Sequence, residues 1–200
     1  MDKAANMGFF NKLFGKEENG KSVADERLIV ENVEQGGLIH IRNYGPDMED
    51  IDVEITRKNM YCQEQFCWYE LQGSASNGKQ VFLEIDRDDE LELDISIDRE
   101  LGLSDIGLTK SDLEEIDEAE KGEITFQGKV YEYDDSDEAF FYRDCDEENE
   151  RAFYYWDFYN DDLEYTITVK EWERGGVDVT LTQSLREDQI EVYSLRPASD

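Results

Sequence analysis

Apolar and polar residues alternate along most of this chain, and the alternation restricts it to a β-rich fold. In IDVEITRK (51–58), Ile51, Val53 and Ile55 alternate with acidic and polar residues. Successive side chains of a strand point to opposite faces, so a period of two with a polar outer face predicts a half-buried antiparallel sheet. The same pattern occurs in four further stretches of the first half, residues 37–45, 66–73, 79–86 and 91–98.

One stretch with a helical period interrupts the strands. LTKSDLEEIDEAEKG (108–122) carries Thr109 at a favourable N-cap position, with Asp112 at the third helical position. Gly122 is placed to end this helix. Because few of its residues are apolar, we expect the helix to lie on the surface between two β units.

The strand pattern resumes after the helix and repeats features of the first half. Trp68-Tyr69-Glu70-Leu71 resembles Tyr155-Trp156-Asp157-Phe158, since each combines two aromatic residues, an acid and an apolar residue. We therefore predict a mainly β protein of two related antiparallel modules, of small barrel or meander type, joined by the short helix. The predicted segments are an amphipathic leader (1–21), a first β module (22–103), a helical connection (104–122), a second β module (123–195) and a tail (196–200).

The aromatic residues of the repeat have two interpretations. Aromatic residues make up 12% of the chain, and each buries a large area, so they can supply a core despite the high charge. We expect Trp68 and Trp156 to pack inside their modules. The alternative is an exposed ligand platform of the kind found in peptide-binding grooves.

The chain is strongly acidic, with 52 acidic and 20 basic residues and a formal charge of −32. A field of this sign repels nucleic acid and anionic lipid, so direct nucleic-acid binding is not expected. The simpler interpretation is high solubility. The alternative is an acidic mimic of nucleic acid that binds a basic protein.

Three cysteines, Cys62, Cys67 and Cys145, do not complete a zinc or iron–sulfur spacing. No secretory signal precedes them, so we expect reduced thiols in a cytoplasmic protein. No apolar run approaches the roughly 18 residues that a membrane-spanning helix needs, so we expect no segment that crosses a bilayer.

Searches for catalytic and metal-binding patterns predict neither an enzyme nor a cofactor. The single histidine, His40, lies in a strand pattern, and no nucleophile elbow or phosphate-binding loop is present. Acidic residues alternate from Asp86 and again from Asp144, but neither stretch has the glycine and glutamate that an EF-hand loop requires. We therefore predict no catalytic, cofactor or metal residues.

The segment MGFFNKLFGKEENG (7–20) is amphipathic, and it overlaps the one positively charged stretch of the chain, residues 1–16, which carry three lysines against one aspartate. Placed at about 100° per residue, its apolar side chains fall within an arc of roughly 160°. Two glycines limit such a helix to about two turns, so it needs a partner surface to form. The candidate membrane or partner contacts are Phe9, Phe10, Leu13, Phe14, Lys12 and Lys16. Docking of the segment onto the protein's own acidic body is the alternative.

Three stretches carry a family resemblance: FCWYELQG with KQVFLEID, ITFQGKVYEYDDSDEAFFYRD, and FYYWDFYNDDLEYTITVKEW. Over about residues 35–195 the chain resembles the bacterial domain of unknown function 4178 family. The resemblance implies a small β-rich protein with no assigned active site. Genes of this family often lie beside those of envelope-stress proteins of the phage-shock type.

These observations together predict a non-enzymatic cytoplasmic protein that binds a protein partner. The resemblance and the basic leader add the expectation of a membrane-stress or membrane protein as that partner, and of weak peripheral contact with the inner membrane through residues 7–16. The acidic mimic of nucleic acid is the alternative function.

Overall fold

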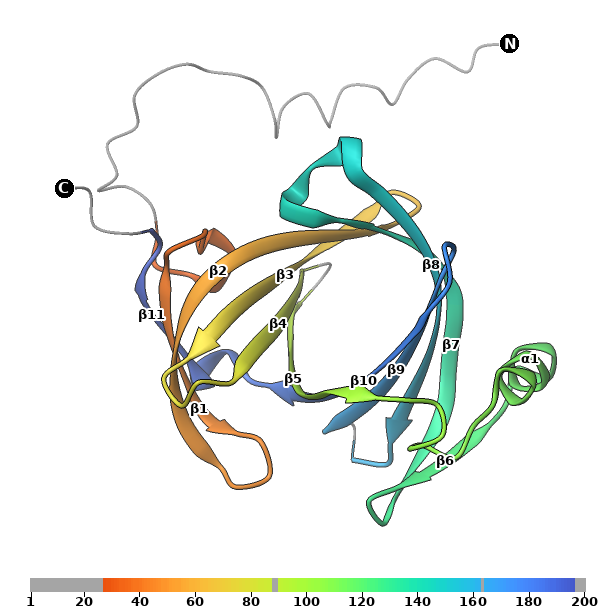
Figure 1. Cartoon of the computed structure of the whole chain (residues 1–200). Helices are drawn as coiled ribbons and strands as arrows, with labels where there is room; N and C mark the ends of the chain where they lie inside the picture. The colour runs from red at the N-terminus through yellow and green to blue at the C-terminus, as the bar shows by residue number, and fades with distance from the viewer. Residues whose placement is uncertain (1–26, 88–89, 163, 197–200) are drawn as a thin grey trace, which may run out of the picture.

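The computed structural model describes residues 27–87, 90–162 and 164–196 (Figure 1). The leader, with its six candidate contact residues, lies outside the described residues. The described chain forms eleven strands and one α-helix. Their bounds are β1 (Leu38–Tyr44), β2 (Glu49–Gln63), β3 (Phe66–Ala75), β4 (Gln80–Arg87), β5 (Leu91–Leu101), α1 (Lys110–Ala119), β6 (Glu123–Phe126), β7 (Lys129–Tyr142), β8 (Glu150–Asn160), β9 (Tyr165–Trp172), β10 (Val177–Leu185) and β11 (Ile190–Ser194).

All strands belong to one antiparallel sheet in the order β11-β1-β2-β3-β4-β5-β10-β9-β8-β7-β6. β2 to β5 form one four-stranded meander and β7 to β10 form another, and β5 pairs with β10 to join them. At the opposite edges, β2 also pairs with β7 through Met60–Tyr142, Tyr61–Phe141 and Cys62–Phe140. The mainly β, antiparallel fold class is therefore confirmed.

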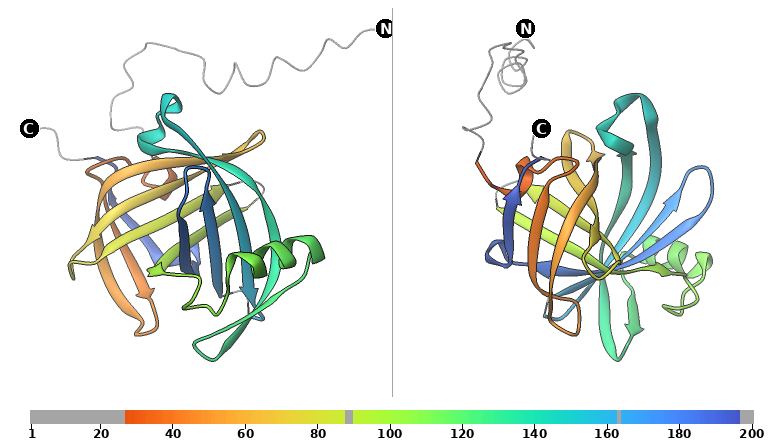
Figure 2. Two further views of the ribbon diagram at one scale, coloured as in Figure 1. Left: turned by 45° about the vertical axis from the view of Figure 1, so that its right-hand side comes forward. Right: turned by 60° about the vertical axis from the view of Figure 1, so that its left-hand side comes forward.

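The sheet is strongly curved but does not form a clean barrel (Figures 1 and 2). Only three residue pairs join β2 to β7, and β1, β11 and β6 continue the sheet beyond the two meanders. Strands from both predicted modules share this sheet, and β11 pairs with β1. The division of the chain into modules stays a prediction.

Two apolar cores lie on the same face of the sheet. The first contains fully buried side chains of β1 to β5, including Ile39, Ile55 and Leu83. The second packs α1 against Phe158 and Val169 of the second meander. Residues that lie directly opposite each other in neighbouring strands point to the same face. Ile95 of the first core lies opposite Gln183 of β10. Two residues earlier on β10 and therefore on the same face, Leu181 lies opposite Ile167, and Val169 of the same strand lies opposite Trp156 in the second core.

The opposite face of the sheet carries polar side chains that are nevertheless buried. They are Asn59, Glu70, Ser96, Thr166, Lys170, Thr180 and Thr182. This face borders the space between the two meanders. The sequence pattern predicts a polar outer face, and the structure corrects that prediction here, because the polar face is the inner one.

The predicted helix and its N-cap are confirmed. The Thr109 hydroxyl accepts a hydrogen bond from the Asp112 backbone N–H at 3.3 Å, and the Asp112 carboxylate accepts one from the Thr109 N–H at 2.7 Å. The prediction that Gly122 ends the helix is wrong, because Glu120 adopts the left-handed conformation (φ 48°) at the C-cap. Gly122 instead allows a close approach, since a Cβ there would lie 2.7 Å from Ile116 Cγ1.

The expectation of three reduced thiols is also wrong. Cys62 and Cys67 lie directly opposite each other in the β2–β3 hairpin and form a disulfide, with their Cα atoms 4.1 Å apart. Cys145 is a free, half-buried thiol. The two-residue loop Glu64–Gln65 places the two cysteines directly opposite each other in the hairpin. The spacing of Cys62 and Cys67 in the sequence, which fits no metal motif, therefore suits a disulfide between neighbouring strands.

No helix in the described ranges has the length and apolar character needed to span a membrane.

Candidate functional site

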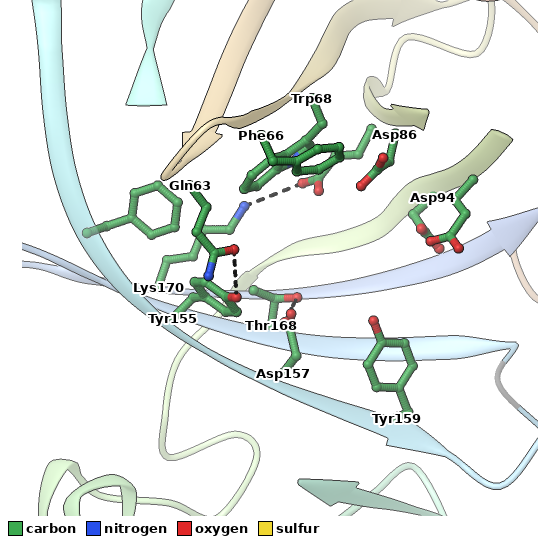
Figure 3. Close-up of a pocket in the computed structure, with 13 residues that line it drawn as sticks. Gln63, Phe66, Trp68, Asp86, Asp94, Tyr155, Asp157, Tyr159, Thr168 and Lys170 are labelled. Atoms are coloured by element: carbon green, nitrogen blue, oxygen red, sulfur yellow. Dashed lines mark hydrogen bonds and ion pairs between the residues drawn. The ribbon is translucent and has the colours of Figure 1, made fainter. Parts of the chain in front are cut away.

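The polar inner face encloses a cavity of about 200 Å³ between the two meanders (Figure 3). β2, β3, β4 and β5 line one side, and β8 and β9 line the other. Five carboxylate side chains and five aromatic side chains surround it, with one amine. The lining consists of Glu84, Asp86, Glu92, Asp94, Asp157, Phe66, Trp68, Phe153, Tyr155, Tyr159, Lys170, Gln63 and Thr168.

The strand period places these carboxylates together. Residues two apart in a strand share a face, so Glu84 and Asp86 of β4 both point inward. In the β4–β5 pairing, Glu84 lies opposite Asp94 and Asp86 lies opposite Glu92. Like charges directly opposite each other destabilise a sheet. A cation in the cavity would relieve this repulsion.

Asp157 is the carboxyl group that the cavity perturbs most clearly. Burial raises its pKa to about 7, and the nearby carboxylates of Glu84 and Asp135 act in the same direction. The Thr168 hydroxyl donates a hydrogen bond of 2.6 Å to Asp157, which opposes part of the shift, as does the charge of Lys170. Asp157 therefore changes charge near neutral pH, inside the cavity.

Burial also raises the pKa values of a second acid and of a phenol in the cavity. Burial raises the pKa of Asp94, although the Ser184 hydroxyl donates a hydrogen bond of 2.6 Å to its carboxylate. Burial, followed by the charges of Asp157 and Asp94, raises the pKa of the Tyr159 hydroxyl. The cavity thus disfavours added negative charge.

Among the described residues, Lys170 is the one cation that lines this cavity. Its Nζ lies 3.4 Å from Glu84 Oε1 and 4.5 Å from the centroid of the Tyr61 ring. The residue is only 6% exposed. Figure 3 shows its amine directed toward the cavity, where a dashed line joins it to a carboxylate. One amine balances one of the five carboxylates and leaves the cavity acidic.

Aromatic rings form the wall beside the disulfide. Trp68 stacks on Phe66 and on Tyr61, with ring centroids 6.0 Å and 5.5 Å apart. Across the cavity, the Tyr155 hydroxyl lies 3.2 Å from Gln63 Oε1 and 3.1 Å from Asp135 Oδ2. Aromatic faces attract cations, so this wall adds to the attraction of the carboxylates.

The sequence predictions for individual side chains have mixed outcomes. Trp156 is buried in the second core, as expected, but Trp68 is half-buried and lines the cavity. His40 lies on β1, where its Nδ1 is 2.8 Å from Asp52 Oδ1 and its ring stacks on Tyr193. In the part of the chain that the structure describes, no group of three or more His, Cys, Asp or Glu side chains is arranged to hold a metal ion.

Sequence reasoning missed the cavity itself. The alternating acids from Asp86 do not fit a calcium loop, and the strand pattern of 79–98 predicts that its acids lie on a polar outer face. The available signal was the number of acids at alternate positions of two neighbouring strands, Glu84 and Asp86 with Glu92 and Asp94. Their position on an inner face depends on pairing with the second meander, which no local pattern reveals.

The fold and the cavity define an antiparallel β protein in which two four-stranded meanders enclose an acidic, aromatic site. The chain belongs to the family described as domain of unknown function (DUF4178), whose sequence model matches residues 47–187. The predicted resemblance is thereby confirmed, and the matched range contains every strand that lines the cavity. No curated protein and no solved structure matches the chain.

Proposed function

We propose that this protein is a non-catalytic binding module whose central cavity receives a cationic side chain, lysine or arginine, from a partner protein. One observation carries the proposal: five carboxylates and five aromatic rings line the cavity, with a single amine. Carboxylates supply charge and aromatic faces supply cation–π attraction, which together suit an organic cation.

The size of the cavity supports a side chain as the occupant. Small-molecule sites usually measure about 300–1,000 Å³, whereas this cavity measures about 200 Å³. Carboxylates line it from β4, β5 and β8, and aromatic rings line it from β3 and β8. Such a lining contacts both the alkyl stem and the charged end of a long basic side chain.

Binding should be accompanied by a proton change. A cation favours the ionised form of Asp157, whose pKa burial raises to about 7. Affinity should therefore increase as the pH rises through about 7, because a larger fraction of Asp157 is then already ionised.

Calorimetric titration at about pH 8 tests the proposal, using a short peptide with one lysine and the same peptide with glutamine in its place. We expect saturable binding of the lysine peptide only, and about tenfold weaker binding to Asp94→Asn. Asp161→Asn is the matched control, since Asp161 is exposed in the β8–β9 turn. Equal binding of both peptides, or no binding, would contradict the proposal.

The family and the leader add a proposal about the partner and its location. We infer that the partner belongs to the envelope-stress system, and that residues 7–16 make weak contact with the inner membrane. The support is the family's gene neighbourhood and the basic, amphipathic character of the leader. Flotation with liposomes, with and without residues 1–16, tests the membrane contact. Equal flotation of the two proteins would refute it.

A further inference from the structure

A second cavity, of about 340 Å³, shares Lys170 with the acidic cavity but has the opposite charge. All eight strands of the two meanders contribute to it. Five of the chain's 20 basic residues line it, against two carboxylates. The charged lining residues are Arg57, Arg99, Arg143, Arg151, Lys170, Glu70 and Asp178. A protein with a net charge of −32 thus gathers positive charge at one place.

The guanidinium groups in this cavity are held in position by aromatic rings. Arg99 lies over the ring of Phe82 at 3.8 Å, and Arg151 lies over Trp172 at 4.3 Å. A ring covers the face of a guanidinium but leaves its N–H donors free along the edge. The N–H groups along this edge can bind an oxyanion with two parallel hydrogen bonds.

Two of the arginines, Arg99 and Arg57, are paired with carboxylates. The Arg99 Nη2 donates to Glu70 at 2.7 Å, and Glu70 also accepts hydrogen bonds from Asn59 and Tyr61. The Arg57 Nε donates to Asp144 at 2.9 Å. These carboxylates neutralise Arg99 and Arg57, so the two paired cations are not the groups expected to bind an anion.

The outer cations are not balanced in the same way. Among the carboxylates that the structure describes, Arg143 has one long contact of 3.8 Å, with Asp144, which Arg57 also contacts. Arg151 is exposed, and within the described ranges its charged group contacts the Trp172 ring and no carboxylate. Two exposed guanidinium groups therefore line the cavity without a close carboxylate among the described residues.

We propose that this basic cavity is an oxyanion site that takes a carboxylate or phosphate group, with Arg143 and Arg151 as its principal contacts. The site does not depend on the cation site, because its lining differs except for Lys170. An anion that binds here must overcome the repulsion of the whole molecule, so binding requires a local arrangement of donors.

Titration of the full chain with inorganic phosphate, in the absence of any peptide, tests the site. We expect saturable binding, with an affinity lowered about tenfold or more in Arg151→Gln, since each charge-assisted hydrogen bond contributes strongly. Arg143→Gln should weaken binding in the same direction. The matched control is Arg186→Gln, because Arg186 is exposed and lies outside the cavity, paired with Asp188. Thermal unfolding of each variant confirms that it is folded.

Absence of saturable phosphate binding would overturn the proposal. An equal loss of affinity in the Arg186 variant would also overturn it, since general charge would then explain the binding. Competition by acetate distinguishes the two sources of the oxyanion: displacement of phosphate assigns the site to carboxylates as well, and no displacement assigns it to phosphate groups. Both results support the site, and neither bears on the lysine-peptide experiment.

Discussion

Asp157 shows how a single residue links the fold to binding. It lies on β8 opposite Thr168, and the cavity raises its pKa to about 7 from the usual value of 3.8 for aspartate. The folded protein therefore binds more protons than the unfolded chain between these two values. The contribution of this difference to the free energy of unfolding is fully present below about pH 4 and is lost as the pH rises through about 7.

Asp157→Asn should remove this pH dependence. Relative to the variant, the parent protein should lose about 2–3 kcal/mol of unfolding free energy between about pH 5 and pH 8. Asparagine keeps an oxygen that accepts the Thr168 hydrogen bond, so the variant should remain folded. Urea denaturation of both proteins at several pH values gives the comparison. Parallel pH profiles for the two proteins would show that Asp157 is not perturbed.

At the scale of elements, the strands and the helix were largely predictable from local patterns. The alternation of β1 and β4 gives their buried residues, because a strand has only two faces. The cap of α1 follows from Thr109 and Asp112. Each of these features depends on residues close together in the sequence.

The inner face of β4 and β5 was not predictable in the same way. A period of two is symmetrical, so it separates two faces but does not say which one is enclosed. The enclosing contacts, β5 with β10 and β2 with β7, join residues far apart in the chain. The outer surface and a polar cavity therefore have the same local sequence pattern.

The β2–β3 hairpin provides a prediction at this scale. Under non-reducing conditions, thiol titration of the denatured protein should find one free thiol, Cys145, and three after reduction. Replacing Cys62 and Cys67 by serine should lower the unfolding free energy by about 2 kcal/mol, because the bond closes only a short loop. Cys145→Ser, with the disulfide intact, is the control. Three free thiols before reduction would contradict the cross-strand bond.

At the scale of the whole molecule, the structure separates charge into two cavities of opposite sign. The acidic cavity carries five carboxylates and the basic cavity five cations, and Lys170 lines both. The alternative function, a mimic of nucleic acid, requires charge arranged on an outer face. The two accounts therefore differ in where a basic partner binds.

We expect a cationic side chain to enter the acidic cavity. NMR mapping of the lysine peptide on the full chain is the most direct measurement of where it binds. The account predicts that ¹H–¹⁵N shift changes concentrate at cavity residues such as Trp68, Tyr155 and Asp157, and that exposed acidic positions such as Asp188 do not change. The contradictory result is a set of shift changes spread over the outer acidic surface, with no change at Trp68 and Tyr155.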